Sequence, residues 1–157
     1  LDASYGKIAF DGSISSHKGE IIIENTIDCT VKDGYIVDIQ GGNDAELLKE
    51  SIAVGEKMAR QFAQEGKIPS DMLDHYVKNA KNIGELGIGL NPEARIIGNM
   101  LEDEKVLSTC HFAVGANYDE DAKAMIHLDG LVQNPTIVAI TADGKETTIM
   151  EDGKLVE

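Results

Sequence analysis

The stretch from residue 20 to residue 39 constrains the fold more than any other part of the sequence. It is rich in β-branched residues, and Lys32-Asp33-Gly34 divides it into two apolar segments. A short polar break ending in Asp-Gly between two such segments is typical of a β-hairpin. The preceding segment, residues 5–16, carries apolar side chains at even spacing, namely Ile8, Phe10 and Ile14. This spacing predicts a strand with one buried face, so the N-terminal third is expected to be an antiparallel meander with a polar turn at residues 17–19.

The middle of the chain changes to helical spacing. After a break at residues 41–44, in which Asn43 or Asp44 could cap a helix, apolar residues recur with helical periodicity from about Ala45 to Gln64. Two shorter helices are expected, one beginning at Pro69 with Ser70 as a possible cap and one over residues 92–101.

The last third returns to strand patterns. Strands are expected around His111 and over residues 125–129, and a closing meander over residues 135–156 turns at Asp143-Gly144 and Asp152-Gly153. The order of strands, helices and then strands predicts an α+β fold, with a largely antiparallel sheet or barrel and flanking helices.

Length and charge limit the possible functions. The 157 residues correspond to one domain, and 42% apolar with 27% charged residues is ordinary for a soluble globular protein. The formal charge of −14 argues against a nucleic-acid or anionic membrane surface. The sequence shows no membrane-spanning run and no signal peptide. Cys29 and Cys110 lie in apolar surroundings, which favours reduced thiols and a cytoplasmic location. Because the chain begins at Leu1 in a strand-like segment, it is expected to be part of a longer protein.

The triplet His127-Leu128-Asp129 is the first candidate for chemistry. In an extended strand, residues i and i+2 leave the same face, so the imidazole of His127 and the carboxylate of Asp129 would meet while Leu128 points away. A neighbouring strand carrying His111 would add a second imidazole, giving a ligand set suited to Zn, Co, Mn or Fe(II). The alternative is a pair of hydrogen-bonded core histidines, with Asp129 capping a turn.

The segment Gly84-Glu85-Leu86-Gly87-Ile88-Gly89 is the second candidate. It lacks the spacing of a phosphate or dinucleotide loop, and its glycines would allow close backbone approach or a bend. A carboxylate in such an apolar setting is costly to bury unless it is paired or bound to metal. Glu85 is therefore a candidate for the same centre, the alternative being that it faces solvent on an edge strand. Cys110 should point away from the His111 side, and His17 and His75 are interpreted as surface or structural residues.

These motifs together resemble the thermophilic metallo-aminopeptidases, aminopeptidases T and S. The resemblance is carried in order along nearly the whole chain by residues 84–89, by Cys110-His111-Phe112-Ala113-Val114-Gly115 with Tyr118, and by residues 127–129. It implies the C-terminal half of that family, a homodimer, peptide substrates and two divalent ions, Zn or Co, that activate a shared water. The metal ligands that it implies are Glu85, Glu104, His111, His127 and Asp129, with Tyr118 and Glu85 as the candidate catalytic residues.

The chain also departs from the family pattern. Glu104, from the pair Asp103-Glu104, lies farther from His111 than its counterpart, and a Pro-Thr-Glu-Glu-like segment that supplies another ligand has no match here. The N-terminal domain of the family is absent too. Two alternatives therefore stay open. One is a domain similar to 2,5-dihydroxypyridine dioxygenases, with one Fe(II) held by His111, His127 and Asp129. The other is an inactive metal-binding or dimerisation fragment.

Overall fold

A computed structural model describes residues 4–119 and 121–156 of the chain. Its strands are β1 Gly6–Phe10, β2 Ser13–Ser16, β3 Gly19–Ile22, β4 Ile27–Lys32, β5 Tyr35–Gln40, β6 Ile83–Ile88, β7 Thr109–Gly115, β8 His127–Gln133, β9 Ile137–Ile140, β10 Glu146–Glu151 and β11 Lys154–Leu155. The helices are α1 Asn43–Gln64, the 3₁₀ turn η1 Ser70–Met72, α2 Leu73–Asn79 and α3 Met100–Asp103. The strands pair antiparallel in three sheets, ordered β1-β4-β5, β11-β10-β9 and β3-β2-β8-β7-β6. The predicted α+β class is confirmed.

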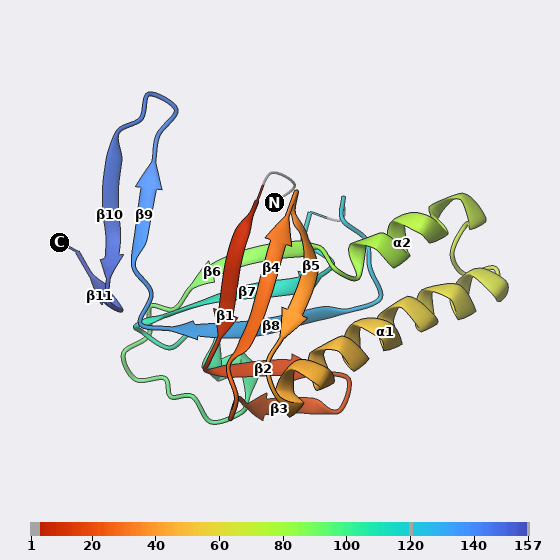
Figure 1. Ribbon diagram of the computed structural model, residues 1–157, viewed down its shortest axis with the longest axis horizontal. Coiled ribbons are helices and arrows are strands. Elements are labelled where there is room, and N and C mark those ends of the chain that lie inside the picture. Colours follow the sequence, from red (N-terminus) through yellow and green to blue (C-terminus); the bar gives the residue numbers. More distant parts are fainter. Residues whose placement is uncertain (1–3, 120, 157) are drawn as a thin grey trace.

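The hydrophobic core lies between the β1-β4-β5 sheet and one face of the five-stranded sheet, with α1 closing one side (Figure 1). The even-numbered pattern of β1 places Ile8 and Phe10 in this core, and the β4–β5 hairpin adds Cys29 and Ile36. The same core contains Leu128, between the two candidate ligands of β8. Burial of these side chains therefore determines which face of β7 and β8 is left for the polar residues.

Helix α1 matches the predicted helix closely, because its buried residues Ala45, Leu48, Ile52 and Ala59 form one face. The expected cap is wrong. The cap position is occupied by Gly42, which has no side chain, so no side-chain hydrogen bond caps the start of α1. The Asp44 carboxylate instead accepts hydrogen bonds from the backbone N–H groups of Glu24 and Asn25, at 2.8 and 2.9 Å. This carboxylate joins the helix start to the loop after β3 rather than capping the helix.

The N-terminal third is not one meander. The strand is interrupted at Asp11-Gly12, where both backbone N–H groups donate to the Leu131 carbonyl of β8. This crossing moves the chain from one sheet to the other. As a result β1 pairs with β4, whereas β2 pairs with β3 and β8. The β4–β5 hairpin at Lys32-Asp33-Gly34 is confirmed.

The helix expected over residues 92–101 is also wrong, since this segment forms turns and only α3, at Met100–Asp103, is helical. The reason is the fully buried carboxylate of Asp103. It accepts the backbone N–H groups of Ile97 and Gly98 and the Ser13 hydroxyl, at 2.9, 3.0 and 2.6 Å. Gly98 has a φ of +78°, which a continuous helix does not permit.

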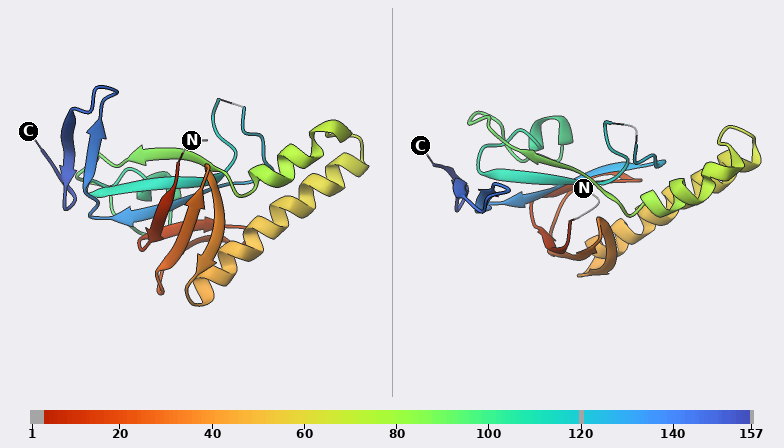
Figure 2. Two further views of the ribbon diagram at one scale, coloured as in Figure 1. Left: turned by 45° about the horizontal axis from the view of Figure 1, so that its top comes forward. Right: turned by 90° about the horizontal axis from the view of Figure 1, so that it is seen from above.

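The two faces of the five-stranded sheet are covered differently. Figure 2 shows the β1-β4-β5 sheet and α1 on one face, and α3 with the loop before β8 on the other. The predicted closing meander forms the β9-β10-β11 sheet, which stands beside the body (Figure 1). Among the described residues, no helix is both long enough and apolar enough to span a membrane.

Candidate metal centre

The sheet register brings the candidate ligands to one face. Glu85 of β6 pairs with Ala113 of β7, and Ala113 pairs in turn with Asp129 of β8. Residues directly opposite in antiparallel strands share a face, so the two carboxylates flank the small Ala113 side chain. His111, two residues before Ala113, leaves β7 on the same face. The opposite face presents Val114 and Leu128 to the core.

The imidazole of His111 extends across β6. His111 pairs with Gly87, and a Cβ added there would lie 2.1 Å from the ring carbon Cε1 of His111. Only glycine leaves room for this ring position. His111 is 5% exposed, and Nε2 of its ring lies 3.2 Å from Oε1 of Glu85. The glycines of the 84–89 segment therefore serve close approach, as the sequence predicts, and Gly87 serves the site directly.

His127 is oriented by the main chain. Its Nδ1 lies 2.8 Å from the carbonyl of Ala116, and because a carbonyl only accepts, Nδ1 carries the hydrogen. In the neutral imidazole the lone pair is then on Nε2, which is 3.2 Å from Oδ1 of Asp129 and 3.5 Å from Oε2 of Glu85. A hydrogen-bonded ring nitrogen of this kind fixes the tautomer of metal-ligating histidines. The Asp129 carboxylate, with help from the Ala116 carbonyl and against the effect of burial, raises the pKa of His127 to about 9.

The distances between these atoms fit a shared cation. Two ligand atoms bound to one zinc ion at about 2.0–2.2 Å lie about 3.0–3.5 Å apart. The three contacts within the cluster are 3.2, 3.5 and 3.2 Å. Glu85, His111 and Asp129 also each offer a ligand atom within 4.8 Å of the others. The interpretation of His111 and His127 as separate core histidines is therefore not supported by the geometry.

Three buried polar atoms of the cluster also fit a metal site. Oε2 of Glu85, Oδ1 of Asp129 and Nδ1 of His111 are buried and make no hydrogen bond of acceptable geometry among the described residues, although Nε2 of His127 lies 3.5 Å from Oε2 and 3.2 Å from Oδ1. Two carboxylates this close together repel each other, and burial makes their charge expensive. A proton on His127 offsets part of that charge. A divalent cation would offset more, so the residues present fit a metal.

Two further predicted residues lie beside the cluster. Tyr118 is 83% exposed, and its ring meets the His127 ring edge-on, with 5.6 Å between the centroids. Glu104 ends α3 and pairs with the ammonium of Lys105. This pairing is the main cause of a raised pKa at Lys105, to which the charge of Glu85 makes a small contribution. The set whose ligand atoms all lie within 4.8 Å of one another is Glu85, His111 and Asp129, and it includes neither Glu104 nor His127. His127 contacts both carboxylates of this set. No such contact is found for Glu104 among the described residues, so its role as a ligand stays a prediction.

The remaining histidines and cysteines lie elsewhere. His17 and His75 are exposed, and Cys29 and Cys110 are buried free thiols whose pKa values are raised, chiefly by burial, to about 12 and about 11. Cys110 leaves β7 on the side away from His111, as expected from strand alternation.

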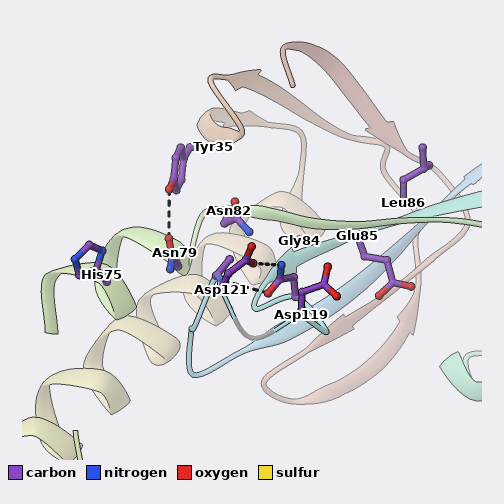
Figure 3. Close-up of a pocket in the computed structure, with 11 residues that line it drawn as sticks. Tyr35, His75, Asn79, Asn82, Gly84, Glu85, Leu86, Asp119 and Asp121 are labelled. Carbon is purple, nitrogen blue, oxygen red and sulfur yellow. Dashed lines mark hydrogen bonds between the residues drawn. The ribbon is translucent and has the colours of Figure 1, made fainter. Parts of the chain in front are cut away.

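A cleft of about 740 Å³ lies beside α2, and Glu85 is the cluster residue in its lining. Figure 3 shows Glu85 at one end, Asp119 and Asp121 from the loop before β8 beside it, and Asn79 and His75 of α2 at the other end. The sequence analysis did not identify this lining. Nor did it identify Ala113 or the Ala116 carbonyl, although the i+2 spacing of Ala113 from His111 was a usable signal.

Comparisons with known proteins agree on the fold. Wild-type AmpT from Thermus thermophilus matches with a TM-score of 0.65 and 14% identity, over 99% of this chain and 38% of its own. A 2,5-dihydroxypyridine dioxygenase from Pseudomonas putida KT2440 matches with a TM-score of 0.68 and 20% identity, over 99% of this chain and 41% of its own. The chain thus spans about two fifths of the length of each structure. No family model and no curated protein matches the sequence.

Proposed function

We propose that this chain is the metal-binding part of an aminopeptidase-like hydrolase that removes N-terminal residues from peptides. Glu85, His111, His127 and Asp129 would hold the metal, with Glu104 as a fifth ligand. The proposal rests on the geometry of the cluster and is supported by the similarity in fold to AmpT. The second similar structure, a dioxygenase, supplies the competing proposal.

The position of Glu85 favours the hydrolase proposal over the dioxygenase proposal. Its two carboxylate oxygens face different imidazoles, Oε1 toward His111 and Oε2 toward His127. Glu85 would therefore be a further ligand beside the two histidines and Asp129, and a set with two carboxylates would suit the divalent ions of a hydrolase. A site with one iron held by two histidines and one aspartate has no need of this glutamate.

Bound divalent ions would supply an acidified water and polarise the scissile carbonyl. The protein residues would orient the ligands, stabilise the oxyanion and accept a proton. The Ala116 carbonyl would keep Nε2 of His127 turned toward the carboxylates. Tyr118, at the rim against His127, would donate a hydrogen bond from its hydroxyl to the developing oxyanion. A glutamate not engaged by metal would accept a proton from the water.

The first test is hydrolysis of leucyl-p-nitroanilide with added Zn(II) or Co(II). The chain spans only part of the similar structures, so a version extended at the N-terminus should be assayed beside it. We expect activity in the extended version and weak or no activity in the 157-residue chain. Equal activity of both would show that the site does not depend on residues outside this chain. Absence of activity in both, with metal bound, would contradict the hydrolase.

The dioxygenase alternative is favoured by the higher identity of its structure and by the availability of His111, His127 and Asp129 as a three-residue ligand set. Counting metals per chain and measuring Fe(II)-dependent oxygen uptake with 2,5-dihydroxypyridine separates the two. A result of two Zn or Co ions per chain without oxygen uptake favours the hydrolase. One iron with uptake favours the dioxygenase. A homodimer, also proposed for this chain, is tested by sedimentation of the extended version.

A further inference from the structure

Strand β6 is an open edge of the five-stranded sheet. The sheet order ends at β6, which has β7 on only one side. Its other side is used by the fold only at the start, where the Lys81 carbonyl accepts the Ile36 N–H and the Ile83 N–H donates to Gly34, both at 2.8 Å. From Gly84 to Ile88 no backbone hydrogen bond on this side is found among the described residues. The edge is therefore free at the position of Glu85.

The hydrogen-bonding pattern shows which groups of β6 face outward. The Gly89 N–H donates to the Thr109 carbonyl at 3.0 Å, which makes residues 89 and 109 a hydrogen-bonded pair. Such pairs alternate along an antiparallel ladder, so Gly87 and Glu85 also bond toward β7. The N–H and C=O groups of Leu86 and Ile88 must then point away from β7. They form a row that an added strand could pair with.

The cleft described above runs beside this row. Gly84, Glu85 and Leu86 line it on the β6 side, so a chain paired with the edge would lie next to the metal ligand Glu85. Among the described residues, the acidic lining groups are Glu85, Asp119 and Asp121, and the other titratable side chains in the lining are His75 and Tyr35. The lining is thus acidic, which favours a cationic occupant.

We propose that a peptide binds as an added strand along Gly84–Ile88, paired through its own main chain and preferring lysine or arginine side chains. The choice of a peptide rests on the proposed hydrolase function, and the mode of binding follows from the open edge beside Glu85. Strand addition of this kind draws affinity from main-chain hydrogen bonds and selectivity from side-chain pockets. A second copy of this chain is a poorer occupant, since each copy carries a formal charge of −14 and would bring like charge to Asp119 and Asp121.

The test uses peptides that cannot be cleaved. A fluorescent lysine-containing hexapeptide, with its first peptide bond reduced to a methylene-amine, is titrated with the zinc-loaded chain. Two further versions carry N-methyl groups on alternate residues, one on odd and one on even positions. Only alternate N–H groups of a strand face its partner, so one version should bind at least about tenfold more weakly than the other. A matched peptide with glutamate in place of lysine should also bind more weakly.

A variant tests the protein side. Proline at an edge position whose N–H points outward leaves the inner ladder intact. Leu86→Pro should therefore weaken peptide binding about tenfold beyond any effect of Leu86→Ala, which removes the same side chain but keeps the outward N–H, with metal content equal in both. The N-methyl series keeps the test valid if the proline variant fails to fold.

The outcomes separate this inference from the proposed function. Alternating N-methyl sensitivity, with no cleavage of any natural peptide by the extended version, supports the edge and contradicts the hydrolase. Cleavage without the alternating pattern supports the hydrolase and overturns the edge. Absence of peptide binding overturns the edge. Loss of a dimer in Leu86→Pro, with peptide affinity unchanged, overturns it in favour of a second copy.

Discussion

The imidazole of His111 lies directly over Gly87 on the neighbouring strand, so that a Cβ at residue 87 would be 2.4 Å from the ring nitrogen Nε2. That nitrogen is the atom that contacts Glu85. The identity of a residue that binds nothing thus determines where a ligand atom can lie. The same contact explains why a glycine occurs in the middle of a strand, where it is otherwise unfavourable.

Gly87→Ala should therefore impair metal binding more than folding. Its methyl group would push the His111 ring out of the cluster, and we expect metal affinity to fall by roughly 10–100-fold, the range seen when residues supporting metal ligands are changed. Competition with a zinc-sensitive dye measures this. Leu86→Ala, on the same strand but the other face, is the matched control. Equal affinity of the two variants would show that His111 is not a ligand.

The fold was largely readable from the sequence because hydrophobic periodicity and turn residues act locally. The β4–β5 hairpin and α1 follow from such local patterns. The failures involve long-range contacts. The break at Asp11-Gly12 depends on the Leu131 carbonyl, and the turns before α3 depend on the Asp103 carboxylate, neither of which any local pattern reveals.

The candidate site, too, was predictable only where local patterns determine it. Strand alternation indicated that His127 and Asp129 share a face, and the structure confirms this. The placement of His111 and Glu85 beside them required the register of β6 and β7, which a bulge between Ile83 and Glu85 shifts. A single sequence does not reveal a bulge of this kind, so Glu85 could be proposed from its chemistry but not positioned.

The metal-free protein should lose stability as the pH rises from about 6.5 to about 9. The Asp129 carboxylate raises the pKa of His127 to about 9, from 6.5. The proton on His127 therefore stabilises the folded state fully below the unfolded value, and this contribution disappears as the pH passes the folded value. At 1.36 kcal/mol per pKa unit the full shift would correspond to roughly 3 kcal/mol, and because the His127 side chain is 30% exposed, solvent screening reduces the expected loss to about 1–2 kcal/mol. Urea unfolding with chelator across this range measures it. His127→Gln should show a correspondingly smaller slope, and equal slopes would contradict the assignment.

Tyr118→Phe should lower kcat by about 10²-fold in the active, extended version, as removal of one oxyanion donor does. Metal content should not change, because the ring contact with His127 does not involve the hydroxyl. Tyr76→Phe, on α2, is the control. A Tyr118→Phe enzyme with unchanged kcat would limit Tyr118 to packing against His127.

Asp103→Asn should destabilise the chain even though it lies outside the cluster. The carboxylate is fully buried and accepts three hydrogen bonds, from the Ser13 hydroxyl and from the N–H groups of Ile97 and Gly98. An amide would turn a donor toward at least one of these donors, so we expect a loss of about 2–4 kcal/mol. Urea unfolding of the metal-free chain measures the effect, with the exposed Asp71→Asn as control. Glu104 follows α3 directly, so the variant should in addition weaken binding of a second metal ion if Glu104 is a ligand. An Asp103→Asn chain that retains two metals while losing stability would restrict Asp103 and Glu104 to structural roles.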